Sequence, residues 1–195
     1  IEFGASGYTG VATLALGSQT LAVGGNFFVV NDSRLTLASG CLTVGGTAYI
    51  GNANGGNSRF VVSGSGTTAS FTSTGGNSPI NLGYADSGDC RDNLLEVRDG
   101  AQLLGGARLG PKACGHHNTI RVTGSGSTWT ATNHKTYIGA VAGSYANMVQ
   151  LEDGATFTGA LSLGEVKGSI SNTLWVSGAN TTWNRTDGQL YIGIA

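Results

Sequence analysis

Residues 118–142, NTIRVTGSGSTWTATNHKTYIGAVA, form the most informative stretch of the chain because their pattern returns later. Residues 172–193 read NTLWVSGANTTWNRTDGQLYIG, with the same opening Asn, the same alternation of apolar residues, the same Trp and the same Tyr-Ile-Gly. Apolar residues at every second position are typical of a half-buried strand and not of a helix. The two copies therefore predict a repeat built from β-strands.

The repeat can be followed from an Asn or Ser that opens each unit, and a degenerate first unit is expected to begin near Ala12. Two positions after each opener we expect one column of apolar residues, and four positions after it a second column. The openers are Ser33, Ser58, Asn93, Asn118, Asn147 and Asn172, and the first apolar column is Leu14, Leu35, Phe60, Leu95, Ile120, Val149 and Leu174. A third strand closes each unit with an apolar residue followed by Gly, as in Ala-Tyr-Ile-Gly at 48–51.

Three short strands in about 25 residues, repeated without a helical segment, predict an all-β fold. We expect a right-handed parallel β-solenoid with three strands per coil and about seven coils, stacked about 4.8 Å apart. Residues 1–195 should form this single domain, either as a segment of a longer chain or as a fibre subunit. The opening Asn is expected at a corner, in the left-handed backbone region, with its amide bonded to the Asn of the next coil.

Composition narrows the possible partners. Charged residues make up 11% of the 195 residues, and the formal net charge is −1 with ten scattered Lys and Arg. A nucleic-acid binder needs a clustered basic surface, so no nucleic-acid partner is expected. No apolar run approaches the roughly 18 residues of a membrane helix, so we expect no membrane insertion of this segment.

The repeats N-x-L-x-V-x-x-G-A and G-S-G-S-T-W…L-Y-I-G resemble those of autotransporter-type passenger domains and related surface-anchored bacterial β-helix proteins, over residues 12–195. The resemblance implies a non-enzymatic, extracellular or cell-surface solenoid that serves as a stalk, adhesin or fibre subunit. Its partners would be other copies of itself, end to end or laterally, or host or matrix glycans. The alternative is a carbohydrate-active β-helix enzyme, a polysaccharide lyase or glycosidase, or a glycan-binding module.

Two of the three cysteines fall at one corner of adjacent coils. Cys90 precedes Asn93 by three residues, and Cys114 precedes Asn118 by four. Adjacent coils bring such positions to about 5 Å, within disulfide range, so an exported protein should join them. The alternative is a pair of reduced, stacked thiols. Cys41 is expected to be a buried, inert thiol.

The same corner carries the most polar loops, GYADSGDCRDN at 83–93 and GPKACGHHN at 110–118. If this solenoid is an enzyme, its catalytic candidates are Asp86, Asp89, Lys112 and His116, converging on one groove. A weak calcium candidate consists of Asp86, Asp89 and Asp92, and no other cofactor is expected. The simpler interpretation is that charges gather in loops because loops are solvated. His134 and Lys135 are likewise expected to be exposed loop residues.

The aromatic residues admit two interpretations. Trp129 and Trp183 recur in alternate coils and are expected to pack inward, although outward rings could stack on sugars. The candidates for a glycan-binding or partner-binding surface are Tyr49, Tyr137, Tyr191 and Trp175. Glu96 and Arg121 share one outward column and should pair across the stack.

Overall fold

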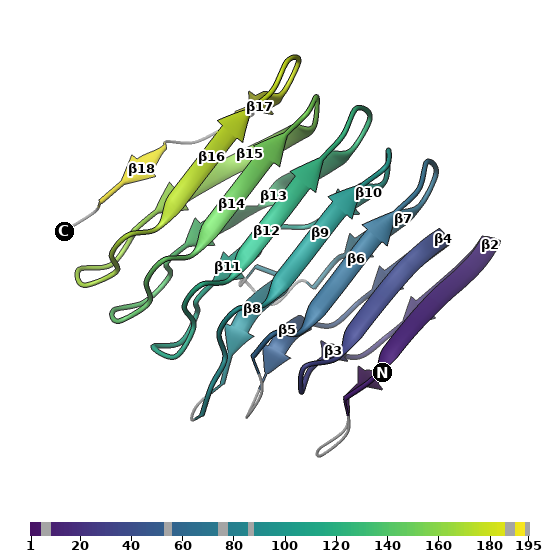
Figure 1. Ribbon diagram of the computed structural model, residues 1–195, viewed down its shortest axis with the longest axis horizontal. Helices are drawn as coiled ribbons and strands as arrows, with labels where there is room; N and C mark the ends of the chain where they lie inside the picture. The colour runs from purple at the N-terminus through teal and green to yellow at the C-terminus, as the bar shows by residue number, and fades with distance from the viewer. Residues whose placement is uncertain (5–8, 53–55, 74–77, 86–87, 186–189, 194–195) are drawn as a thin grey trace.

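The computed structural model describes residues 1–4, 9–52, 56–73, 78–85, 88–185 and 190–193. Over these residues the chain contains strands and no helix, and every strand pairing in its sheet is parallel. The chain winds as a β-solenoid of about seven turns, with its two termini at opposite ends (Figure 1). The described residues accordingly include no helix that is long and apolar enough to cross a membrane.

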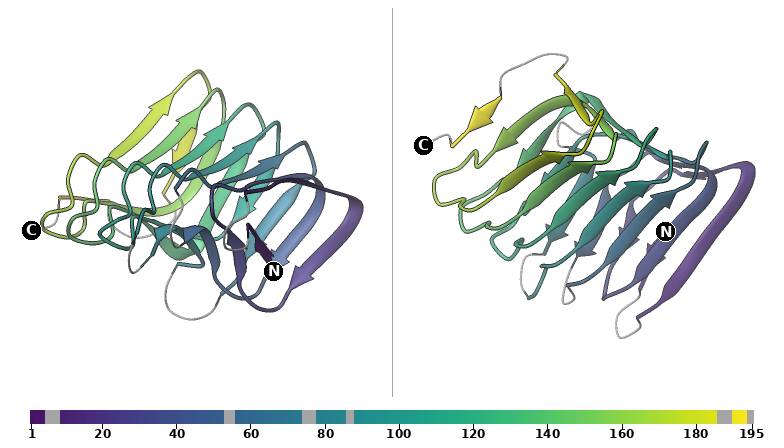
Figure 2. Two further views of the ribbon diagram at one scale, coloured as in Figure 1. Left: turned by 60° about the horizontal axis from the view of Figure 1, so that its bottom comes forward. Right: turned by 45° about the horizontal axis from the view of Figure 1, so that its top comes forward.

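Three strands per coil form three faces (Figure 2). The first face consists of the first halves of β2 (Val11–Val23) and β4 (Arg34–Val44), then β6 (Arg59–Ser63), β9 (Leu94–Arg98), β12 (Thr119–Thr123), β14 (Met148–Glu152) and β16 (Thr173–Ser177). The second face continues β2 and β4 and adds β7 (Thr68–Phe71), β10 (Gln102–Leu104), β13 (Thr128–Ile138), β15 (Thr156–Leu163) and β17 (Thr182–Asn184). The third face consists of β1 (Glu2–Phe3), β3 (Phe27–Val29), β5 (Ala48–Asn52), β8 (Ile80–Tyr84), β11 (Ala107–Leu109), the ends of β13 and β15, and β18 (Tyr191–Ile192).

The core is a set of continuous apolar columns, one for each inward position of a strand. Phe60 pairs with Leu95, Leu95 with Ile120, and Ile120 with Val149, and all four side chains are fully buried. Burial of this kind stabilises the fold by about 25 cal/mol per Å² of apolar surface. From the second coil onward the predicted columns are therefore confirmed.

The predicted register of the first coil was wrong by two residues. Ala12 pairs with Leu35, and Leu14 pairs with Leu37, so that Gly10 occupies the opener position and its N–H donates to Ser33 Oγ at 3.2 Å. The register of β2 then shifts before Thr20. The first coil carries no Asn or Ser at its opener, so the sequence pattern offered no marker for its start.

Trp129 and Trp183 both point into the core. The Trp129 side chain is fully buried, its indole Nε1 donates to the Gly105 carbonyl at 2.8 Å, and its ring centroid lies 4.4 Å from that of Phe157. Trp183 Nε1 donates in the same way to the carbonyl of Gly159 at 3.0 Å. Each indole thus fills the coil and ties its only polar atom to the backbone of the adjacent coil.

The predicted position of Cys41 was wrong. Cys41 pairs with Thr68, and Thr68 pairs with Gln102, so the thiol belongs to an outward column and is half-buried. The inward Ala101 stands one position earlier in the repeat. The Ser-Gly-Cys motif at 39–41 and the Asp-Gly-Ala motif at 99–101 look alike in the sequence. Strand pairing nevertheless offsets them by one residue, because it aligns Cys41 with Gln102 and not with Ala101.

Candidate functional site

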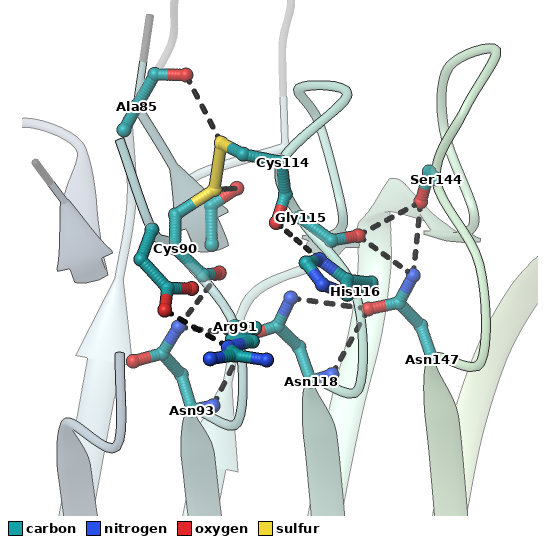
Figure 3. Close-up of a disulfide and its surroundings, with 12 residues drawn as sticks. Ala85, Cys90, Arg91, Asn93, Cys114, Gly115, His116, Asn118, Ser144 and Asn147 are labelled. Carbon is teal, nitrogen blue, oxygen red and sulfur yellow. Dashed lines mark hydrogen bonds and ion pairs between the residues drawn. A yellow bond between two sulfur atoms is a disulfide. The ribbon is translucent and has the colours of Figure 1, made fainter. Parts of the chain in front are cut away.

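The corner between the third and first faces holds the polar loops that the sequence singled out (Figure 3). A disulfide joins Cys90 to Cys114, whose Cα atoms lie 5.5 Å apart on adjacent coils. The bridge closes a segment with a sequence separation of 24 residues and ties these two polar loops together. Because it constrains the unfolded chain, such a bridge stabilises the fold by about 3.5 kcal/mol.

Beside the disulfide, the opening Asn residues form a buried ladder (Figure 3). Asn118 Oδ1 accepts from the backbone N–H of Asn93 at 3.2 Å and from Asn93 Nδ2 at 2.8 Å. Asn147 Oδ1 accepts the same pair of bonds from Asn118, both at 3.1 Å, and Asn172 Oδ1 accepts them from Asn147. Each amide therefore satisfies a buried backbone N–H and a buried side chain of the coil before it.

The left-handed backbone position is not the Asn itself, and that expectation was wrong. The positive φ angles belong to the residue before each opener, which frees the Asn to turn its side chain along the stack. These residues are Asp32, Asn57, Asp92, His117, Ala146 and Ser171, with φ between 52° and 57° in all but Asn57, where it is 61°.

The ladder explains the Gly at the end of the third strands β5, β8 and β11 and at the third-face end of β13. A Cβ added to Gly83 would collide with the Asn118 side-chain amide, and one added to Gly139 would collide with the Asn172 amide. The same Gly residues have φ of 72° and 73°, which L residues rarely adopt. The Gly at the end of a third strand thus leaves room for the Asn side chain that lies against it from the neighbouring coil.

The charged side chains at this corner contact one another and the backbone. Asp89 Oδ2 lies 2.9 Å from Arg91 Nε, and Asp92 Oδ2 lies 3.7 Å from the same atom. His116 Nδ1 lies 2.6 Å from the Cys114 carbonyl and donates its proton to it, and its ring centroid lies 4.6 Å from that of Tyr145. Burial lowers the pKa of His116, and His117 and Arg91 add to the effect.

The three catalytic candidates that the structure describes are not directed at one space. Lys112 Nζ lies 4.8 Å from the ring centroid of Tyr84, whereas His116 is directed toward its own loop and Tyr145. Asp89 engages Arg91. Asp86, which belongs to both the catalytic and the calcium candidates, lies outside the described residues.

Within the part of the chain that the structure describes, no group of three or more His, Cys, Asp or Glu side chains could hold a metal ion. The remaining calcium candidates, Asp89 and Asp92, share the Arg91 guanidinium. The disulfide and the Asn ladder at this corner hold adjacent coils in register.

Three of the four aromatic candidates lie on the third face, where they contact other rings or cations. Tyr49 stacks on Phe28, with centroids 5.1 Å apart and planes at 11°. Lys135 Nζ lies between the rings of Tyr137 and Tyr191, at 5.0 and 4.3 Å from their centroids, and 3.3 Å from Glu165 Oε1. Their ring faces are therefore partly covered by the protein itself.

Trp175, the fourth candidate, lies on the first face and is 53% exposed, with its Nε1 bonded to Ser177 Oγ at 3.0 Å. The first face also carries the expected ion pair, because Arg121 Nη1 lies 3.6 Å from Glu96 Oε1. The Arg121 guanidinium makes a shorter contact with Glu152, at 2.9 Å. This network spans three coils and supports their register.

One feature of the surface was missed by the sequence reasoning: a groove of about 520 Å³ at the corner between the second and third faces. Ser70, Leu104, Thr130 and His134 are among the residues that line it. The signal was present in the loop lengths, because the turn at Gly105-Gly106 is much shorter than the turns before and after it. His134 and Lys135 are accordingly half-buried and bonded, not exposed as expected.

Comparison of the chain with protein-family models, with curated proteins and with solved structures found no significant match.

Proposed function

We propose that this protein is a non-enzymatic, extracellular β-solenoid that acts as a rigid structural or adhesive element, as in a surface stalk, an adhesin or a fibre. The observation that carries the proposal is the unbroken register of the first face from β6 to β16, which is held at one corner by the ladder of Asn93, Asn118, Asn147 and Asn172. Stacked hydrogen-bonded coils resist bending, because every coil is bonded to both neighbours along its length. A rod of this kind serves to hold or display a surface at a fixed distance.

An extracellular location is supported by the cysteines. A structural disulfide persists in oxidising compartments and is rare in the cytosol. The Cys90–Cys114 bridge also joins coils, where it adds to the stiffness of the rod. The resemblance of the repeats to passenger domains points to the same location.

Alkylation of the protein in intact producing cells, followed by peptide mass spectrometry, tests this location. We expect Cys41 to react without a reductant, and Cys90 and Cys114 to react only after reduction. Protease added outside the intact cells should also cleave the protein. If Cys90 and Cys114 react without a reductant, and external protease does not cleave the protein, the proposed location is ruled out.

We further propose that copies associate end to end. The proposal is supported by the parallel stacking itself, because strand edges and inward apolar columns, such as the one that pairs Leu151 with Val176, can be continued by a coil of the same pattern in another copy. Sedimentation velocity and electron microscopy of the purified chain should show assemblies that grow with concentration.

A pair of variants distinguishes the mode of association. Val176→Glu places a charge in the stacking surface and should abolish the assemblies, whereas Trp175→Glu, on the outer side of the same coil, should leave them intact. The reverse result would indicate lateral contact. A chain that stays monomeric at every concentration would exclude self-association.

A further inference from the structure

The corner between the second and third faces differs in length from coil to coil. Only Gly105 and Gly106 connect β10 to β11, whereas residues 72–79 connect β7 to β8 in the coil before. In the coil after, the pairing of β13 with β15 shifts between Ala131 and Thr136, which leaves residues 132–135 as extra length. The short coil is therefore recessed between two longer ones, and the recess is the groove of about 520 Å³.

The two longer coils bond to each other across the recess. His134 Nε2 donates to the Ser73 carbonyl at 3.0 Å, and Ser78 Oγ donates to the Lys135 carbonyl at 2.6 Å. Neither Gly105 nor Gly106 can be replaced by a larger residue without a collision. A Cβ added to Gly105 would lie 2.8 Å from the Phe71 carbonyl oxygen, and a Cβ added to Gly106 would lie 2.6 Å from the His134 Cβ. The groove is thus fixed by contacts on both sides and by the glycines of the short turn.

The lining combines an apolar strip with hydroxyl groups. Strand pairing places Ser70, Leu104 and Thr130 side by side on the outward column of the second face. Since neighbouring strands lie about 4.8 Å apart, the two hydroxyl-bearing residues stand about 10 Å apart with the half-buried Leu104 between them. Thr72 and Thr132 add further hydroxyls to the rim.

The charge of the groove restricts its ligand. The described residues that line it include no Asp, Glu, Lys or Arg, and the one ionisable side chain, His134, already bonds to the Ser73 carbonyl. A charged ligand would lose its hydration without gaining an ion pair. A purely apolar ligand would cover hydroxyl groups without bonding to them.

We propose that this groove binds a neutral pyranose unit of a glycan. The C–H face of the sugar ring packs on Leu104, and ring hydroxyls on either side bond to Ser70 and Thr130. The groove volume falls in the 300–1,000 Å³ range of small-molecule sites. This proposal goes beyond the structural role proposed above and does not depend on it, because the groove lies within one chain and needs no second copy.

The test uses the purified chain and the methyl pyranosides of glucose, galactose, mannose and N-acetylglucosamine. The acidic counterpart is the methyl glycoside of galacturonic acid with its carboxylate free, called methyl galacturonate below. Saturation-transfer NMR and calorimetric titration should detect at least one neutral pyranoside with a Kd in the millimolar range, which is the affinity expected for a ligand of this size. Methyl galacturonate should bind more weakly than the neutral sugar.

Matched variants assign the binding to the groove. Thr130→Val removes one hydroxyl and keeps the shape, and it should weaken binding about tenfold, the usual effect of one lost hydrogen bond. Thr158→Val makes the same change one coil further along the same outward column, outside the groove, and should leave the Kd unchanged. Leu104→Asn should abolish saturation transfer.

Circular dichroism and melting temperature of each variant show whether its fold is retained. The proposal fails if no neutral pyranoside binds, if the acidic sugar binds better, or if Thr130→Val and Thr158→Val weaken binding equally. None of these results bears on end-to-end stacking or on location, so the two proposals are tested separately.

Discussion

Replacing Asn118 by Ala tests whether the corner ladder stabilises the solenoid. Asn118 is fully buried, and its loss removes two bonds from Asn93 and one bond to Asn147. Asn93 Nδ2 keeps the Cys90 carbonyl at 3.0 Å, but the buried Asn93 N–H loses its acceptor. An unsatisfied buried donor costs about 1–3 kcal/mol, and the two lost side-chain bonds cost about 1 kcal/mol each, so we expect a destabilisation of about 3–5 kcal/mol.

Asn172→Ala is the matched control, because the chemistry of the change is the same and the burial differs. Asn172 also accepts two bonds from the Asn before it, but its side chain is only partly buried. Water can replace its oxygen there, so we expect a loss of about 1 kcal/mol or less. Guanidinium unfolding followed by far-UV circular dichroism measures both values.

Amide hydrogen exchange adds a local readout, since coils of a solenoid can open one at a time. The amide of Asn93 should lose protection in the Asn118→Ala protein, whereas amides of the third face should not. If Asn118→Ala and Asn172→Ala destabilise the fold equally, or if the Asn93 amide stays protected, the ladder is not a source of stability.

Three further predictions follow from the same corner. Gly83→Ala should cost about 3 kcal/mol, because strain at positive φ adds to a collision with the ladder, whereas Gly17→Ala, at φ +62° with open space around it, should cost about 1 kcal/mol in urea unfolding. The Cys90→Ser, Cys114→Ser double variant should lose about 3.5 kcal/mol in the same assay, and reduction of the wild type should reproduce that loss. Folding lowers the pKa of His116 below its ordinary 6.5, so the unfolded chain binds the proton first and stability should fall as pH drops below 6.5; His116→Gln should flatten this dependence between pH 7.5 and 5.

The sequence was sufficient for the architecture because stacking places like residues on like. The apolar columns through Phe60 and Leu95 follow from the spacing alone, whereas the spacing favoured an inward Trp129 and left the outward direction open. The positions of Cys90 and Cys114 relative to their openers also indicated a shared corner. A solenoid is unusual in that its long-range contacts join equivalent positions of adjacent repeats, so the contacts can be read from the repeat pattern directly.

The errors arose where the repeat pattern changes. The first coil lacks an opening Asn or Ser, so its register was placed two residues too late. Cys41 was assigned to an inward column because Ser-Gly-Cys resembles Asp-Gly-Ala in the sequence, although strand pairing offsets the two motifs by one residue. The groove beside Leu104 was missed for the same reason, because it depends on how turns of different length lie against one another and not on any one motif.

The start of the ladder follows from one residue in the coil before it. In the ladder, the Gly that ends a third strand lies against the opener one coil beyond the opener that it precedes in the chain, as Gly51, which precedes Ser58, lies against Asn93. The pairing of β3 with β5 sets Val30 beside Gly51, so Val30 takes the place of that Gly under Ser58. The Val30 side chain is buried there, and Ser58 Oγ has no hydrogen-bond partner. An Asn at an opener thus requires Gly at the position that lies against it, and this requirement explains why Ser58 is not part of the ladder, which runs from Asn93 toward the C-terminus.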